Sequence, residues 1–258
     1  MDELLYEVRD TIGWISFNRP AARNALTFAM YERLAEICAA QTAAPTLRAL
    51  VLTGAGDKAF AAGTDISQFR AFAGPEDAIA YEARLDRVLD TLERCPVPTI
   101  AALSGACTGG GAGIAACCDL RIAAANLRFG FPIARTLGNC LSMANIARLS
   151  ALIGPARVKE MIFSARLLEA EEARSVGLIS DILPDAAALL ARAEELAHSI
   201  AAHAPLTLRA TKEAVRRLRF QHAPDADKDL ILMCYLSNDF REGMEAFLAK
   251  RPPAWQGR

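Results

Sequence analysis

The sequence predicts an α/β fold with a helical region at its C-terminal end. Through about residue 124, short apolar runs of strand length alternate with longer segments of helical spacing, a pattern typical of parallel strands joined by helices. From about residue 205 the spacing is helical, with no strand-like run between the helices. We therefore divide the chain into an α/β core over residues 1–204 and a C-terminal helical region over residues 205–258.

The first predicted elements are two strands, a helix and a third strand. Residues 4–8 and 12–17 are β-prone runs, and Pro20 stops the second because proline cannot donate a ladder hydrogen bond. Thr27 is suited to cap the helix that follows, in which apolar residues recur at helical spacing. Residues 47–52 then form a buried strand, which Gly54 closes.

The next elements repeat this alternation before the helices take over. A helix over residues 76–93 carries an apolar stripe, and two prolines delimit a strand over residues 99–103. A glycine-rich turn leads into a helix ending near Cys117, and residues 119–124 form another strand. The C-terminal region contains three predicted helices, over residues 204–220, 226–236 and 239–250.

The composition of the chain argues against several classes of protein. The 258 residues include 29 Lys and Arg and 30 Asp and Glu, and the resulting charge of −1 gives no support to nucleic-acid binding. Uninterrupted apolar stretches of membrane-spanning length and a signal-peptide pattern are both absent. Seven irregularly spaced cysteines, with no CxxC pair, fit reduced thiols better than disulfides or a structural metal. We expect a cytoplasmic protein with no membrane, nucleic-acid or metal partner.

Two segments rich in glycine and alanine follow predicted strands. Residues 59–66 come after the strand at 47–52, and residues 104–113 come after the strand at 99–103. Open α/β sheets bind ligands at the carboxyl ends of their strands, and small residues leave backbone N–H groups accessible. Two such groups aimed at one point would form an oxyanion hole. The same glycines equally suit close helix–strand packing, and the spacing alone does not decide between these readings.

Dinucleotide binding is a weaker interpretation of the same glycines. Residues 54–59 and 111–116 both match a relaxed G-x-G-x-x-A pattern. The first match is not followed by a clear helix, and the second has no acidic residue about 20 positions later. The pattern therefore does not favour a dinucleotide site.

Several phrases of the sequence resemble the enoyl-CoA hydratase/isomerase (crotonase) family. They occupy residues 18–26, 59–66, 109–123, 129–132 and 239–251, so the resemblance covers nearly the whole chain in the right order. It implies a core that is a spiral of ββα units, and a C-terminal helical region that forms trimers, often paired into hexamers. It also implies acyl-CoA thioester substrates, with coenzyme A as part of the substrate and no permanently bound cofactor.

The resemblance also implies roles for particular residues. The backbone N–H groups of Thr64 and Gly110 match the family's oxyanion hole, which stabilises the enolate of the thioester. The residues whose positions match the family's coenzyme A contacts are Ala22, Arg23, Ala62, Ile66, Phe247 and Lys250.

The sequence departs from the family at the two positions where hydratases carry a catalytic glutamate. These positions hold Gly113 and Ile133, and residues 120–159 contain no Asp or Glu at all. Hydration needs one group to activate water and one to protonate the α-carbon, so we expect weak or absent hydration of simple enoyl-CoA substrates.

Cys140 lies near the place where some relatives carry a catalytic carboxylate. Its thiol would act as a nucleophile or proton carrier if a cation such as Arg135 lowered its pKa. The commoner interpretation of a free cysteine is a small buried hydrophobic residue. The alternatives to hydration are isomerisation, thioester or C–C bond hydrolysis, dehalogenation, or acyl-CoA binding without catalysis.

Overall fold

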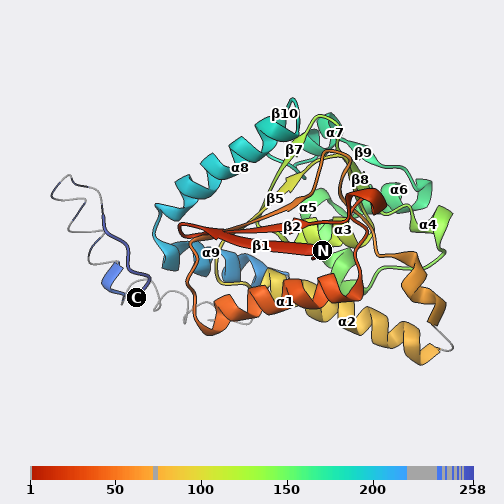
Figure 1. The fold of residues 1–258 in the computed structure, drawn as a ribbon, viewed down its shortest axis with the longest axis horizontal. Coiled ribbons are helices and arrows are strands. Elements are labelled where there is room, and N and C mark those ends of the chain that lie inside the picture. The colour runs from red at the N-terminus through yellow and green to blue at the C-terminus, as the bar shows by residue number, and fades with distance from the viewer. Residues whose placement is uncertain are drawn as a thin grey trace.

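The chain builds its core from repeated units of two strands and a helix (Figure 1). The computed structural model describes residues 2–71, 75–219, 237–239 and 253–258, and the single residues Glu242, Ala246, Ala249 and Arg251. The first three units are β1 (Leu4–Arg9), β2 (Ile12–Phe17) and α1 (Phe28–Ala43); β3 (Ala49–Gly54), β4 (Ala59–Ala62) and α2 (Pro75–Glu93); and β5 (Thr99–Leu103), β6 (Ala106–Thr108) and α3 (Gly110–Cys117). The ββα core implied by the family resemblance is therefore confirmed.

One strand of each later unit joins β1 and β2 in a six-stranded sheet, in the order β1-β2-β3-β5-β7-β10. β7 (Leu120–Ala124) and β10 (Ile182–Leu183) complete this sheet. β1 pairs with β2 antiparallel, and the remaining pairs are parallel as predicted. The predicted strand at 47–52 is displaced, since β3 runs to Gly54. A Cβ atom at Gly54 would lie 2.2 Å from the carbonyl oxygen of Ala59, so glycine is needed where the chain turns back into β4.

The second strand of each later unit forms a separate four-stranded sheet, in the order β4-β6-β8-β9. It is completed by β8 (Arg128–Gly130) and β9 (Leu168–Glu169). The glycine- and alanine-rich segments 59–66 and 104–113 thus each contain a short strand that was not predicted from the sequence. These strands were not predicted because they have only four and three residues, most of them small. Such short runs show no clear alternation of apolar and polar side chains.

Alternation along the six-stranded sheet divides its side chains between two cores. One face packs against α8 (Ala186–Ala201), which crosses the strands in Figure 1. This smaller core includes Trp14, Val51, Ile100 and Leu189. The opposite face belongs to the larger core, which lies among both sheets and the helices α1, α2 and α3.

The remaining helices connect the strands or extend the core. They are the 3₁₀ turns η1 (Pro20–Ala22) and η2 (Ile66–Ala71), and the helices α4 (Ile133–Thr136), α5 (Met143–Ile153), α6 (Pro155–Ser164), α7 (Ala170–Ser175) and α9 (Pro205–Leu218). The predicted cap of α1 is confirmed, because the Thr27 side chain accepts a hydrogen bond from the amide of Met30.

The C-terminal region begins with α9, the first of the three predicted helices. Lys212 of this helix donates to the Asp119 carboxylate at 2.7 Å, which fixes α9 against the core. The helix predicted over residues 226–236 lies outside the described residues, as does most of the one predicted over 239–250. In the described part of the chain, no helix has the length and apolar character needed to cross a membrane.

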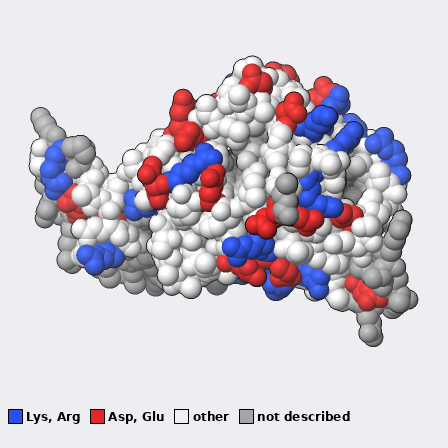
Figure 2. Space-filling view, viewed as in Figure 1, with Lys and Arg blue, Asp and Glu red and all other residues white. Residues whose placement is uncertain are grey.

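Positive and negative side chains are interspersed on the molecular face shown in Figure 2. Many charged side chains of the described residues are paired; examples are Arg128 with Glu169 at 2.7 Å and Arg157 with Glu160 at 2.9 Å. Such exposed pairs contribute about 0–1 kcal/mol each to stability. This face therefore combines both signs of charge rather than presenting one.

Candidate active site

A cavity of about 370 Å³ opens at the carboxyl edge of the four-stranded sheet. The parallel register pairs Ala62 of β4 with Thr108 of β6, and Thr108 in turn with Gly130 of β8. Because the three strands end level with one another, the residues that follow them emerge side by side. Thr64, Gly110 and Ile133 consequently line one cavity.

The segments 63–64 and 109–110 are in close contact at this edge. A Cβ atom at Gly109 would lie 3.4 Å from the Gly63 Cα, and one at Gly110 would lie 3.1 Å from the Thr64 Oγ1. Gly63 and Gly109 have φ angles of +92° and +51°, which glycine adopts without steric cost. These two glycines turn the chain so that the next residues, Thr64 and Gly110, border the cavity.

The amides of Thr64 and Gly110 remain available to a ligand. Gly109 caps α3 without a side-chain hydrogen bond, and the first bond of this helix runs from Gly113 N to Gly109 O. Among the described residues, neither the Thr64 nor the Gly110 amide donates to a protein acceptor. Unpaired N–H groups at a helix start favour a ligand atom that carries negative charge.

A chain of three hydroxyl groups borders this pair of amides. The Thr64 Oγ1 lies 2.9 Å from the Tyr31 hydroxyl of α1 and 2.9 Å from the Tyr81 hydroxyl of α2. A Cβ atom at Gly110 would lie only 1.9 Å from the Tyr31 hydroxyl, so this hydroxyl is close to the start of α3. Burial raises the pKa of both tyrosines, which keeps the phenols protonated and able to donate.

The opposite wall of the cavity is formed by one face of α2. Glu82, Leu85 and Leu89 recur at helical spacing along it, and all three line the cavity. A Cβ atom at Gly113 would lie 3.5 Å from Leu89 Cδ1, so the apolar end of this face covers the glycine. Burial and, after it, the nearby Asp86 carboxylate raise the pKa of Glu82 above its ordinary value.

The loop with Arg23 lies along one side of the same cavity. The Arg23 carbonyl accepts a hydrogen bond from Ala62 N at 3.0 Å, which ties the loop to β4. Arg23 also lines an adjoining cavity of about 290 Å³, together with Lys58. Two cationic side chains thus border the second cavity, and Arg23 borders both.

The structure brings together most of the residues singled out in the sequence. The first cavity is lined by Arg23, Ala62, Thr64, Ile66, Gly110, Gly113, Ile133 and Cys140. Ala22 is exposed on η1 and does not line the cavity. Phe247 and Lys250 lie outside the described residues.

Of the two residues Cys140 and Arg135, only Cys140 lines the cavity. Cys140 is exposed and lines the cavity, so the alternative that it is a small buried hydrophobic residue is wrong. Arg135 is exposed on α4 and is not among the lining residues, so its suggested position as a cationic neighbour of the thiol gains no support.

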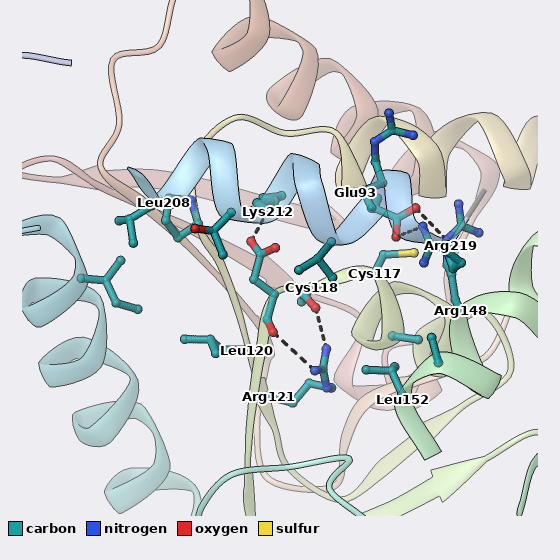
Figure 3. A pocket seen from close by; sticks show the side chains of 18 residues that line it. Glu93, Cys117, Cys118, Leu120, Arg121, Arg148, Leu152, Leu208, Lys212 and Arg219 are labelled. Carbon is teal, nitrogen blue, oxygen red and sulfur yellow. Dashed lines mark hydrogen bonds and ion pairs between the residues drawn. The ribbon is translucent and has the colours of Figure 1, made fainter. Parts of the chain in front are cut away.

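A larger cavity of about 470 Å³ lies at the other end of α3, shown in Figure 3. Its charged side chains are engaged with one another or with backbone oxygens. Arg148 donates to Glu93 at 3.0 Å, Lys212 to Asp119 at 2.7 Å, and Arg121 to the carbonyl of Cys118. Burial raises the pKa of the Cys117 thiol at this cavity to about 12, so it is protonated near neutral pH. We interpret this cavity as structural packing rather than a reaction site.

Comparison with known proteins shows the family of this chain. Residues 7–258 match the family model described as enoyl-CoA hydratase/isomerase. The chain belongs to the enoyl-CoA hydratase/isomerase family.

Individual relatives match over almost their full length. A crotonyl-CoA hydratase of Syntrophomonas wolfei is 33% identical, with 97% of this chain and 96% of that protein aligned. An (E)-benzylidenesuccinyl-CoA hydratase of Thauera aromatica is 35% identical, with coverage of 97% and 98%. The crystal structure of an enoyl-CoA hydratase/carnithine racemase from Magnetospirillum magneticum aligns with a TM-score of 0.92 at 35% identity, covering 100% of this chain and 97% of that one. The present chain is thus an acyl-CoA enzyme of this family.

Three residues of the site were missed in the sequence: Tyr31, Tyr81 and Glu82. The sequence predicts only a helix with apolar spacing around Tyr31, and an apolar stripe on the helix that contains Tyr81 and Glu82. The helical spacing offered one signal for Glu82. It lies three positions before Leu85 and seven before Leu89, and those leucines mark the buried face of the helix.

Proposed function

We propose that this enzyme binds the acyl portion of an acyl-CoA thioester in the 370 Å³ cavity and stabilises its enolate. The thioester oxygen accepts hydrogen bonds from the backbone N–H groups of Thr64 and Gly110. The observation that carries this proposal is the pair of amides, adjacent to one another, bordering one cavity and without protein acceptors in the described part of the chain. One donor of this kind contributes roughly 10²–10³ in rate, because it favours the charge that develops on oxygen.

The coenzyme A portion occupies the side of the cavity formed by the Arg23 loop. Arg23, Ala62 and Ile66 border that side, and Lys58 faces the adjoining cavity. Phosphate groups are attracted to such cationic side chains through charge-assisted hydrogen bonds. The family resemblance adds the proposal of a trimer or a hexamer, which light scattering coupled to size-exclusion chromatography tests directly.

Efficient hydration is not part of this proposal. Gly113 has no side chain to activate water, and Leu89 covers it. Ile133 is buried and apolar. We propose instead that the enzyme moves a proton on the acyl chain, a reaction that needs the oxyanion site and a base but no activated water.

Calorimetric titration with butyryl-CoA, S-butyl-CoA and free coenzyme A tests the proposed binding mode. S-butyl-CoA keeps the chain but has no carbonyl oxygen, so the difference between the first two ligands measures the interaction at that atom. We expect butyryl-CoA to bind at least tenfold more tightly than S-butyl-CoA. Equal affinities would contradict the oxyanion site, and a fast conversion of crotonyl-CoA to its hydrated product would contradict the expected loss of hydration.

A further inference from the structure

We propose that Glu82 of α2 is a catalytic residue of this site: its carboxylate removes a proton from the carbon next to the thioester carbonyl and returns it two carbons further along. This inference rests on the proposed function, since it requires a thioester held at Thr64 and Gly110. It assigns the base to a helix that faces the positions where the usual hydratase glutamates are replaced.

Glu82 lies on α2 among the residues that line the cavity. The neighbouring residue, Tyr81, is joined to Thr64 by a hydrogen bond of 2.9 Å, which holds this turn of α2 beside the proposed oxyanion site. Three residues further along, Leu85 lines the cavity, and Leu89 contacts the position of Gly113. Glu82 therefore lies on the cavity-facing stripe of α2, at the end nearest the two amides.

The Glu82 carboxylate also acts electrostatically on the two tyrosines near the start of α3. After burial and the influence of Tyr81, the Glu82 carboxylate contributes to the raised pKa of Tyr31, whose hydroxyl adjoins Gly110. It has the same effect on Tyr81. A carboxylate that interacts with both phenols is close to the point where the thioester oxygen would be held.

Glu82 differs from Asp86, the next acidic residue of the helix, in its hydrogen bonding. Asp86 accepts hydrogen bonds from Ser142 at 2.7 Å and from Asn145 at 3.4 Å, so it has a structural role. Glu82 accepts no hydrogen bond and forms no ion pair with any of the described residues. A half-buried carboxylate with unused acceptor capacity, in a cavity, is suited to proton transfer.

The surroundings of Glu82 tune it for this task. Leucine side chains remove water from one side, and the raised pKa makes the carboxylate a stronger base than an exposed glutamate. The titratable groups facing it are Asp86 and Tyr81 on α2, Tyr31 on α1, Arg23 from its loop and Cys140 from the segment before α5. Among these, Arg23 is the cation, and it lies on the coenzyme A side.

The proposed reaction balances without a further reactant. The Glu82 carboxylate takes the proton from C2 of a 3-enoyl thioester, and the C–H electron pair forms a C1–C2 double bond as the carbonyl electrons move to oxygen. When the carbonyl re-forms, the electrons shift to make a C2–C3 double bond, and the former C3–C4 double bond takes the proton from Glu82 at C4. The product is the 2-enoyl thioester, and Glu82 is again a carboxylate.

The test is exchange of the α-protons of butyryl-CoA in D₂O, followed by NMR, with the binding of butyryl-CoA measured on the same samples. This saturated probe reports removal of the proton whatever the natural acyl group. We expect Glu82→Gln to slow exchange by about 10²-fold or more while Kd stays within about threefold, and Glu82→Asp to retain part of the rate. Conversion of 3-butenoyl-CoA to crotonyl-CoA should fall in parallel.

The matched control is Asp90→Asn on the same helix. Asp90 pairs with Arg94 at 2.6 Å on the surface and does not line the cavity, so exchange should continue at the wild-type rate. The wild-type rate should follow one ionisation with a pKa above the ordinary value of a glutamate, and this ionisation should vanish in Glu82→Gln. Thermal unfolding of each variant checks that it is folded.

The outcomes separate this inference from the proposed function. If the wild type binds butyryl-CoA and Glu82→Gln exchanges as fast as the wild type, Glu82 is not the base, although the binding site stands. Binding by the wild type without any exchange overturns the assignment equally. If neither thioester binds, the proposed function itself is wrong, and the assignment of Glu82 falls with it.

Discussion

The two ends of α3 border two cavities of opposite character. At the amino end, the amides of Thr64 and Gly110 and the carboxylate of Glu82 have no hydrogen-bond partner within the described residues. At the carboxyl end, the charged side chains lining the larger cavity are engaged in ion pairs or hydrogen bonds. In the larger and more charged cavity, the described charged side chains are thus already engaged with other protein groups.

This contrast shows how polar groups can distinguish a reaction site from packing. Buried polar groups without partners are costly, so a fold retains them where a ligand uses them. Paired groups are already satisfied and gain nothing from a ligand. Cavity volume alone favours the carboxyl end of the helix, since about 470 Å³ lie there against about 370 Å³ at the amino end.

Breaking the charge cluster at the carboxyl end should give the largest effect. Glu93 pairs with both Arg148 and Arg219, and its side chain is only 12% exposed. Glu93→Gln removes the buried carboxylate that Arg148 and Arg219 share, which should cost about 3–5 kcal/mol in the free energy of unfolding measured in urea. Glu160→Gln, at a half-exposed pair, should cost below about 1 kcal/mol. If both variants lose the same small amount, the cluster is not structural.

Adding a methyl group to Gly110, at the amino end of α3, should give the next largest effect, and this effect is on turnover rather than on stability. In Gly110→Ala the new Cβ would lie 1.9 Å from the Tyr31 hydroxyl, so either the tyrosine or the start of α3 must move. We expect a loss of about 10²-fold in α-proton exchange, the effect of misplacing one oxyanion donor. Adding Tyr31→Phe should restore part of the rate, because the nearest atoms then become the Thr64 Oγ1 at 3.1 Å and the ring carbon at 3.2 Å. A double variant as slow as Gly110→Ala would contradict this steric explanation.

Removing a single partner from the carboxyl end gives a smaller effect. Lys212 donates to Asp119 at 2.7 Å and to the Val97 carbonyl at 3.3 Å. In Lys212→Met the Asp119 carboxylate keeps the amide and hydroxyl of Thr99 as donors, so the loss should be about 1–2 kcal/mol. Chemical denaturation measures it, and acyl-CoA affinity should not change. A changed affinity would mean that the two cavities are coupled.

The smallest expected effect is a pH-dependent gain in stability at the amino end. The folded state raises the pKa of Glu82, so it binds this proton more tightly than the unfolded chain does. Protonated Glu82 therefore contributes to the stability of the folded protein below the pKa that this residue has in the unfolded chain. This contribution is lost as the pH rises through the pKa of Glu82 in the folded protein. Glu82→Gln should therefore unfold at a higher temperature than the wild type at pH 7, with the difference shrinking toward pH 4. A constant difference across this range would contradict the raised pKa.

Five strands of the larger sheet were predictable from the sequence because each is a β-prone run of five or six residues, whereas the two-residue β10 was not predicted. β2 and β5 fall at their predicted bounds, and the cap of α1 at Thr27 follows from residue type. The smaller sheet could not be predicted from the sequence, because strands such as β6 have only three residues and glycines follow directly. Its existence followed only from the family resemblance, which implied two strands in each unit.

The backbone half of the site was predictable, and the side-chain half was not. Thr64 and Gly110 stand in recognisable phrases, and the structure brings them together through the register of Ala62 with Thr108. Glu82 is far from both in the sequence, on a helix that no motif connects with the site. Residues 120–159 contain no carboxylate, whereas Glu82 lines the cavity from another unit of the spiral.

Asn24 gives the Arg23 loop a property that matters before any ligand arrives. Its fully buried side chain donates to the carbonyls of Ala55 and Ala59, at 3.0 and 2.7 Å, and accepts from the Arg19 amide at 2.9 Å. The backbone that carries Arg23 is therefore ordered in the free protein. Ordering a loop during association costs conformational entropy, and a loop that is already fixed avoids this cost. A phosphate-bearing ligand would thus meet a rigid recognition surface rather than one that forms around it.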